Sequence, residues 1–318
     1  MSYTDQSQMN VTVGVQYHGL LGLLFFSTVT TVLCCAFLFI NGTLIFTLRS
    51  KSVFCETSRY ILLYNLLFAD TVLLALSQLL FILAACRITL TYPVCGVLTL
   101  FSNLTSEISP LTLVVMSLER YVAVCYPLRH ATIITIRNTG VAISVVWAFS
   151  SLNVLTRLLL LIHFPFEDLR MKNFCSKVAM FPGPISDLYD KAYTCFLFVL
   201  AGVAVISSYI AVMVAAKSAS EDRASAQKAR NTLLLHLVQL GLSLSSTIHN
   251  PMLIAISKNA TRMEQAHIQV ILYVCVSLLP RCLSSLVYGI RDPTIRPVLM
   301  YHLCCRMKRS PISAKAKK

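Results

Sequence analysis

The sequence predicts an all-α membrane protein, a bundle of seven transmembrane helices followed by a short amphipathic helix. Composition already excludes a water-soluble domain. Of the 318 residues, 56% are hydrophobic and only 13% are charged, and the mean hydropathy is +0.72. Soluble domains carry about 25% charged residues, and a chain of this length could not bury so much apolar surface. Lipid is therefore the solvent that this surface requires.

The spacing of the apolar runs gives the number of spans. A helix needs about 20 residues to cross a hydrocarbon core, and lipid excludes open strands because their backbone groups would stay unpaired. Seven runs meet this length: 20–48, 60–85, 94–126, 141–163, 192–216, 231–256 and 268–290. The chain thus divides into an N-terminal tail (1–19), a seven-span domain (20–290) and a C-terminal tail (291–318). No internal repeat is visible, which disfavours a transporter built from repeated halves.

Basic residues between the runs set the orientation. The net charge is +14, and it lies in short segments between apolar runs, so it indicates topology and not nucleic-acid binding. The segments after spans one, three, five and seven hold Arg49, Lys51, Arg59, Arg129, Arg137, Lys217, Arg223, Lys228, Arg230, Arg291, Arg296 and the terminal lysines. We therefore expect an extracellular N-terminus and a cytoplasmic C-terminus in a multi-pass protein of the plasma membrane.

A short helix is expected after the seventh span. Asp292 can cap its first turn, and Pro293 suits a first helical position. Apolar residues Ile295, Val298, Leu299 and Leu303 then share one face, which is typical of an amphipathic helix on the inner leaflet. Pro297 disfavours a helix that begins before Thr294. Cys304 and Cys305 follow and are candidates for palmitoylation, with unmodified thiols as the alternative.

The end of span three carries the most specific motif. Residues 116–130 read MSLERYVAVCYPLRH. This stretch resembles the MAxDRYVAICxPLRY pattern of odorant receptors, a branch of the rhodopsin-like class A G-protein-coupled receptors. The resemblance extends over the whole chain and is best for the divergent odorant receptors of teleost fish. It implies that Glu119 holds Arg120 in the silent state, that Arg120 and Tyr121 take part in coupling, and that the arginine reorients on activation.

Other positions match the same family. Residues 228–237 have the spacing of the family's KAxxTCxxHL motif, which places His236 among the switch residues. Tyr209 and Tyr288 match switch tyrosines of spans five and seven, and Trp147 matches the tryptophan of span four. The resemblance also implies a Cys95–Cys175 disulfide, which an oxidising exterior permits.

Several departures from the family put its switching geometry in doubt. Ser284 and Ser285 replace the Asn-Pro pair before the tyrosine of span seven, and the proline of span five is missing near Ala201. Span six has His249-Asn250-Pro251 in place of the aromatic proline motif. Proline kinks are hinge points in helices, so the moving parts here can differ from those of relatives.

Charged residues inside the spans are candidates for function. Asn41 and Asp70 match the family's intramembrane polar cluster, and Arg281 lies in span seven. An unpaired arginine at mid-bilayer costs about 2.5–3.5 kcal/mol on the most lenient scale, so we expect Arg281 to pair with Asp70 where many relatives bind sodium. Sodium binding by Asp70 is the alternative.

In the family, small organic odorants bind in the outer half of the bundle, between spans three, five, six and seven. The positions expected to face that region are polar. They are Ser102, Ser106, Glu107, Tyr193, Thr247 and Tyr273. Glu107 is expected either to meet a cationic ligand or to pair with Arg157 of span four.

The resemblance therefore implies an odorant receptor that binds a small, water-soluble odorant and activates a stimulatory, olfactory-type heterotrimeric G protein. A class A receptor that reads a metabolite outside the nose is the alternative, and a transporter is the more distant one. No HExxH, P-loop or GxSxG motif occurs, so no enzyme is expected. No CxxC pair occurs either, and we expect no metal or cofactor.

The orientation predicts glycosylation of the tail. Asn10-Val11-Thr12 is an N-glycosylation sequon there, and Asn259-Ala260-Thr261 is a weaker candidate because it lies close to the bilayer. An N-glycosidase should shift the wild-type protein on a gel, and Asn10→Gln should remove most of that shift. A shift of full size in Asn10→Gln would contradict the prediction.

Overall fold

The computed structural model describes a largely helical chain. The described residues are 3–86, 88–162, 175, 184–218, 231, 234, 237–238, 241, 268, 271–279, 281–282, 289, 292 and 294–303. For 3–21, 23, 26, 162, 184, 187, 216–218, 276–277 and 303 only the course of the helix is described. Five predicted site residues lie outside this part of the chain, as does the side chain of Asn10: His236, Thr247, Tyr288, Cys304 and Cys305.

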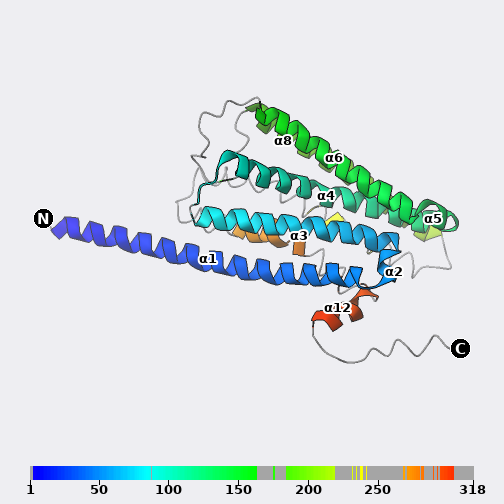
Figure 1. Ribbon diagram of the computed structural model, residues 1–318, viewed down its shortest axis with the longest axis horizontal. Helices are drawn as coiled ribbons and strands as arrows, with labels where there is room; N and C mark the ends of the chain where they lie inside the picture. The colour runs from blue at the N-terminus through cyan, green and yellow to red at the C-terminus, as the bar shows by residue number, and fades with distance from the viewer. Residues whose placement is uncertain are drawn as a thin grey trace.

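Five long helices form the described part of the bundle. They are α1 (Tyr3–Arg49), α3 (Ser58–Ala85), α4 (Tyr92–Cys125), α6 (Ile136–Ile162) and α8 (Pro184–Ser218). They run side by side in Figure 1, where α4 packs against α3, α6 and α8. All five are long and apolar enough to cross a membrane, so the first five predicted spans correspond to helices.

Helix α1 extends further than its apolar run. The run was expected from residue 20, whereas α1 begins at Tyr3, and its membrane-compatible part is Ser27–Arg49. No proline interrupts this stretch, and adding a residue to an existing helix requires no new nucleation. Residues 3–19 of the tail therefore continue the helix of the first span.

Three short helices accompany the long ones. They are α2 (Ser52–Cys55), α5 (Pro127–Ile133) and α12 (Ile295–Leu303). Helices α2 and α5 lie at the end of the bundle opposite the N-terminus, and α12 lies beside α1 (Figure 1). Pro127 occupies the start of α5, where its missing N–H costs nothing. We call this end of the bundle the α5 end.

The later spans are described in part. In the seventh, residues 271–282 are helical where described, and Tyr273–Leu278 form a π-helical stretch, η1. Such stretches are rare and often occur at functional sites. In the predicted sixth span, Leu237 is helical and packs against Ala201 and Val205 of α8.

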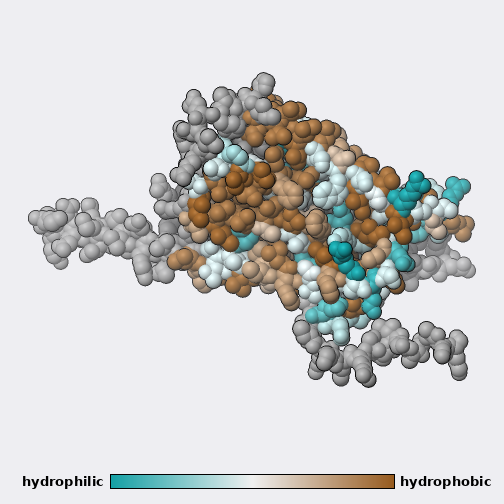
Figure 2. All heavy atoms as spheres, in the orientation of Figure 1, coloured by the Kyte–Doolittle hydropathy of each residue, from teal (hydrophilic) through white to brown (hydrophobic). Residues whose placement is uncertain are grey.

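The outer surface of the bundle is apolar. Figure 2 shows hydrophobic side chains along the helices, with hydrophilic ones gathered toward the end that carries α2 and α5. Phe25, Phe39 and Val203 are all more than half exposed. In the bilayer this surface meets lipid chains, which is why exposure of large apolar side chains costs little there.

Several hydroxyl groups within the spans are satisfied by their own helices. Thr28, Thr43, Thr71 and Thr112 each donate to the carbonyl four residues earlier, at 2.6–2.8 Å. Without water, every polar group needs such a partner. Threonine and serine therefore enter these spans at small cost.

Asp292 joins α12 to α3 at the α5 end. Its Oδ1 accepts hydrogen bonds from the backbone N–H of Thr294 at 2.9 Å and of Ile295 at 3.3 Å. The predicted cap is thus present, and α12 begins at Ile295. The same carboxylate accepts from the Tyr60 hydroxyl at 3.4 Å and lies 3.2 Å from Arg59 Nη2. It therefore also ties α12 to the start of α3.

Apolar contacts hold α12 from the other side. Ile295 and Leu299 are buried in a cluster with Leu44 of α1. The apolar face was expected to lie on the inner leaflet, and these two of its residues pack against the bundle instead. A methyl group added at Gly289 would lie 2.6 Å from the Leu299 side chain, so a larger residue here requires the Leu299 side chain to shift. Pro297 falls in the first turn of α12. A backbone N–H there would have no partner within the helix, so the lack of one in proline breaks no hydrogen bond.

Removal of the Asp292 carboxylate should loosen α12. We expect Asp292→Ala to cost about 1 kcal/mol for the cap alone, with a further loss from the Arg59 pair. Asp292→Asn keeps a capping oxygen and should cost less. Thermal unfolding of the purified protein and hydrogen exchange at 295–303 measure both effects. Wild-type exchange in Asp292→Ala would contradict the role of this contact.

Candidate functional site

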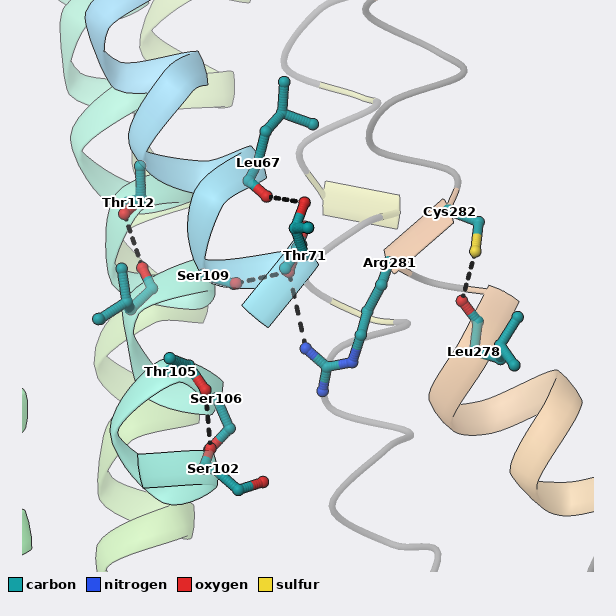
Figure 3. A network of polar contacts seen from close by, with 12 residues as sticks. Leu67, Thr71, Ser102, Thr105, Ser106, Ser109, Thr112, Leu278, Arg281 and Cys282 are labelled. Carbon is teal, nitrogen blue, oxygen red and sulfur yellow. Dashed lines mark hydrogen bonds and ion pairs between the residues drawn. The ribbon is translucent and has the colours of Figure 1, made fainter. Parts of the chain in front are cut away.

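An ion pair connects the second, third and seventh spans. Arg281 Nη1 lies 3.6 Å from Asp70 Oδ1, and the Ser109 hydroxyl of α4 donates to the same oxygen at 2.6 Å. Figure 3 shows the Arg281 side chain extending across from the seventh span, with Ser109 on the far side of the contact. Asp70 is buried. The expected Asp70–Arg281 pair is therefore present in the structure, with Ser109 as a partner that the sequence did not single out.

Asn41 was expected in the same cluster. Its side chain is fully buried in α1. Neither its amide nitrogen nor its amide oxygen has a hydrogen-bond partner among the described residues. The described part of the chain therefore does not join Asn41 to the Asp70–Arg281 pair.

The coupling motif lies at the α5 end of α4. Arg120 Nε lies 3.0 Å from Glu119 Oε2, and the Glu119 side chain is buried. His130 of α5 also approaches this carboxylate, with its Nε2 at 3.9 Å from Oε1. Glu119 thus holds Arg120 on one side and faces α5 on the other.

Three tyrosines lie near the α5 end of α4. The ring of Tyr121 packs edge-on against Tyr126, with 5.8 Å between ring centroids. Tyr209 of α8 packs in a small cluster with Val212 and with Val124 of α4. Tyr209 is therefore placed beside the end of α4 that carries the motif.

The opposite end is closed by a covalent bond. Cys95, near the start of α4, forms a disulfide with Cys175, with 5.6 Å between the Cα atoms. Both sulfur-bearing side chains are buried. The expected pairing is confirmed, and we call this end of the bundle the disulfide end.

A polar cluster lies between α4, α6 and α8. The buried Glu107 carboxylate accepts hydrogen bonds from the Asn153 amide of α6 and from the Tyr193 hydroxyl of α8, the latter at 2.9 Å. The Tyr189 hydroxyl donates to Asn153 Oδ1 at 2.6 Å. Glu107 and Tyr193, two of the expected ligand-facing residues, are thus in direct contact.

Arg157 has a different partner from the one considered for it. It forms an ion pair with Asp190 of α8, and its guanidinium also lies over the Tyr189 ring, 5.6 Å from the centroid. The pairing of Arg157 with Glu107 was one expected alternative, and the structure assigns Arg157 to Asp190. Asp190 lies one turn before Tyr193 on α8, which brings its carboxylate to α6.

The other expected ligand-facing residues are spread more widely. Ser106 donates to the Asn103 carbonyl of its own helix at 2.7 Å, and Ser102 is half-buried on α4. Tyr273 donates to Gln78 of α3 at 3.1 Å and stacks on Phe81. Tyr273 therefore belongs to the contact between α3 and the seventh span.

The hydrogen bonds of Asn65 were not predicted from the sequence. The Trp147 indole donates to Asn65 Oδ1 at 2.9 Å, and Asn65 Nδ2 donates to the Thr112 hydroxyl at 2.9 Å. These bonds join α6, α3 and α4. A lone asparagine in an apolar span was the available signal, because such a group must find a partner in lipid.

The comparisons with known proteins identify the chain. Residues 40–290 match the family model described as 7 transmembrane receptor (rhodopsin family). The chain belongs to this receptor family. The receptor is also 34% identical over 283 residues to "Odorant receptor 131-2" of Danio rerio, which covers 88% of this chain and 86% of that protein.

More distant relatives carry related names. The receptor is 29% identical over 196 residues to the human "Olfactory receptor 2A12", covering 59% of this chain and 61% of that protein. It is 24% identical over 253 residues to the canine "Olfactory receptor-like protein OLF4", covering 77% and 80%. The expected family and the seven-span fold are confirmed. The chain is a receptor, as expected, and neither an enzyme nor the transporter that was the more distant alternative.

The Asp70–Arg281 pair makes a double-mutant prediction. Asp70→Asn or Arg281→Met alone leaves one charge buried without its partner, which costs about 3–5 kcal/mol in buried pairs. The double variant leaves no charge and should recover much of the loss. Surface display and thermal unfolding of the four proteins measure the coupling. Additive losses would contradict a direct pair.

Proposed function

We propose that this receptor is an odorant receptor of the plasma membrane. It binds a small, water-soluble odorant within the helix bundle and activates a stimulatory, olfactory-type heterotrimeric G protein, which raises cyclic AMP. The observation that carries the proposal is the Glu119–Arg120 ion pair at the α5 end. It lies within an odorant-receptor motif in a chain 34% identical to a protein named odorant receptor.

Two features support an extracellular disulfide end. Disulfides persist in oxidising compartments, and Cys95–Cys175 lies at this end. Basic residues prefer the cytoplasmic side, and Arg129 and Arg137 lie around α5 at the other end. The N-terminus is then outside, and Arg120 faces the cytoplasm.

The coupling step follows from the contacts of Arg120. In the silent state the charge of Arg120 is held by Glu119, which is itself buried beside α5. Release of Arg120 from this carboxylate makes its donors available to the G protein. A ligand that stabilises the released state shifts the population toward it by its differential affinity for the two states.

The ligand enters from the disulfide end and meets polar groups of α4 and α8. Glu107 and Tyr193 lie there, in contact with each other. Their polarity favours a ligand with charged or hydrogen-bonding groups, which can exchange hydrogen bonds with this cluster, whereas an apolar odorant that separated them would leave each group without its partner.

Cyclic AMP in cells that express the receptor with an olfactory-type G protein tests the proposal. Pools of amino acids, carboxylic acids, amines, bile salts and nucleotides are applied. We expect a response in wild type that Arg120→Ala reduces at least about tenfold, since the charged donor that the G protein meets is lost. Arg137→Ala is the control, because it removes an exposed arginine of the same end.

Equal surface display of the three proteins is required. A full response in Arg120→Ala would contradict the assigned role of this arginine. Silence of a well-displayed wild type toward every pool would contradict coupling to this G protein.

A further inference from the structure

We propose that the seam between α4, α6 and α8 binds the carboxylate group of a small organic ligand, held by Arg157 and Asn103 in exchange for the Asp190 carboxylate. The inference deepens the proposed function, on which it rests, by naming the ligand class. It uses residues that lie one helical turn beyond Glu107 toward the disulfide end.

The first layer of the seam fixes the register of the three helices. Glu107 of α4 contacts Asn153 of α6 and Tyr193 of α8. Consecutive spans alternate in direction, so α6 runs antiparallel to α4 and α8. Toward the disulfide end, residue numbers therefore fall along α4 and α8 and rise along α6. Residues the same number of positions away from this contact lie at the same depth on the three helices.

The second layer lies one turn, about 5.4 Å, toward the disulfide end. Four residues from the first layer, α4 presents Asn103, α6 presents Arg157 and α8 presents Tyr189, with Asp190 next to it. The Arg157–Asp190 pair and the Arg157–Tyr189 contact agree with this register. Asn103 is thereby placed on the same level as Arg157, on the α4 side.

Two donors of the second layer lack acceptors. Asn103 Nδ2 and Arg157 Nε are both buried and have no hydrogen-bond partner among the described residues. The two residues are 8% and 3% exposed. A buried donor without an acceptor costs about 1–3 kcal/mol, so such groups are uncommon in native proteins. Two at one level indicate a place for an acceptor that the described residues do not supply.

Asp190 shows which acceptor the site is built for. Its carboxylate already pairs with Arg157, yet its side chain is 25% exposed while that of Arg157 is 4% exposed. The aspartate can therefore withdraw to solvent while the arginine stays buried. Exchange of one carboxylate for another leaves the buried charge unchanged, which avoids the cost of a new unpaired charge. A cationic ligand would instead have to approach the guanidinium.

The exchange also links binding to helix position. The Arg157–Asp190 pair ties α6 to α8. A ligand carboxylate that replaces Asp190 releases this tie and connects α6 to α4 through Arg157 and Asn103. Binding thereby favours states in which α8 has moved relative to α6, and α8 is the helix that carries Tyr209 near the coupling motif.

A thermal-shift experiment on the purified full-length receptor in lipid nanodiscs tests the inference without a G protein. The probes are the straight-chain carboxylates from acetate to octanoate, with the amide and the amine of each chain length. A ligand of the native state raises its melting temperature. We expect at least one carboxylate to raise it, and the amide and amine of the same length to have no comparable effect.

Variants locate the effect. Arg157→Met should weaken binding of the active carboxylate roughly 10- to 100-fold, as expected for loss of a charge-assisted contact. Arg157→Met/Asp190→Leu leaves no unpaired charge in the seam and guards against misfolding of the single variant. Arg137→Met is the matched control, since it removes an exposed arginine from the same helix.

A rescue experiment uses the smallest probe. Asp190→Ala leaves Arg157 without its internal carboxylate, so acetate should raise the melting temperature of this variant more than that of wild type. The same acetate should have no such effect on the double variant. Equal acetate effects on the three proteins would overturn the proposal.

The remaining outcomes are equally decisive. Stabilisation by amines alone, by no carboxylate at all, or by carboxylates to the same extent in the double variant would overturn the inference. A carboxylate that binds at Arg157 while the cyclic AMP assay stays silent would support this site and contradict the proposed coupling, so the two failures are distinguishable.

Discussion

Lipid offers no hydrogen bonds, so polar and charged groups in the spans of this receptor are stabilised by partners within the protein. That constraint explains where the helices meet. Asp70 and Arg281 join the second and seventh spans, Trp147 and Asn65 join α6 to α3, and Arg157 and Asp190 join α6 to α8. Apolar side chains fill the space between these contacts but cannot by themselves fix the register, because lipid chains would cover them equally well.

Most of the fold could be predicted from the sequence. Apolar runs located five long helices to within a few residues at most ends, since burial in lipid imposes one clear length. The exceptions have local causes. Helix α1 continues to Tyr3 because nothing in its sequence stops it, and α2 and α5 are too short to produce a periodic signal. The cap at Asp292 was predictable, whereas its contacts with Arg59 and Tyr60 join residues far apart in the sequence.

The candidate site was predictable where a charged residue inside a span had one acidic partner aligned with it. Arg281 had Asp70 as its acidic partner because the family resemblance aligns the two positions. For Arg157 the sequence offered only Glu107 as an acidic partner, because the fifth span was expected to begin at residue 192 and Asp190 lay outside it. Helix α8 begins at Pro184, and the turn that carries Asp190 faces α6. Asn153 and Tyr189 escaped notice because neither belongs to a motif. Their roles follow from the three-helix register, which only the structure supplies.

The π-helical stretch Tyr273–Leu278 has a consequence for comparing this receptor with its relatives. A π turn closes with one residue more than an α turn, and one residue corresponds to about 100° of rotation around a helix. Residues before and after η1 therefore do not share the register of an uninterrupted helix. Against a helix that lacks such a stretch, positions beyond Leu278 coincide only when a one-residue gap is introduced, and simple counting from Tyr273 would place a residue about 100° away around the helix.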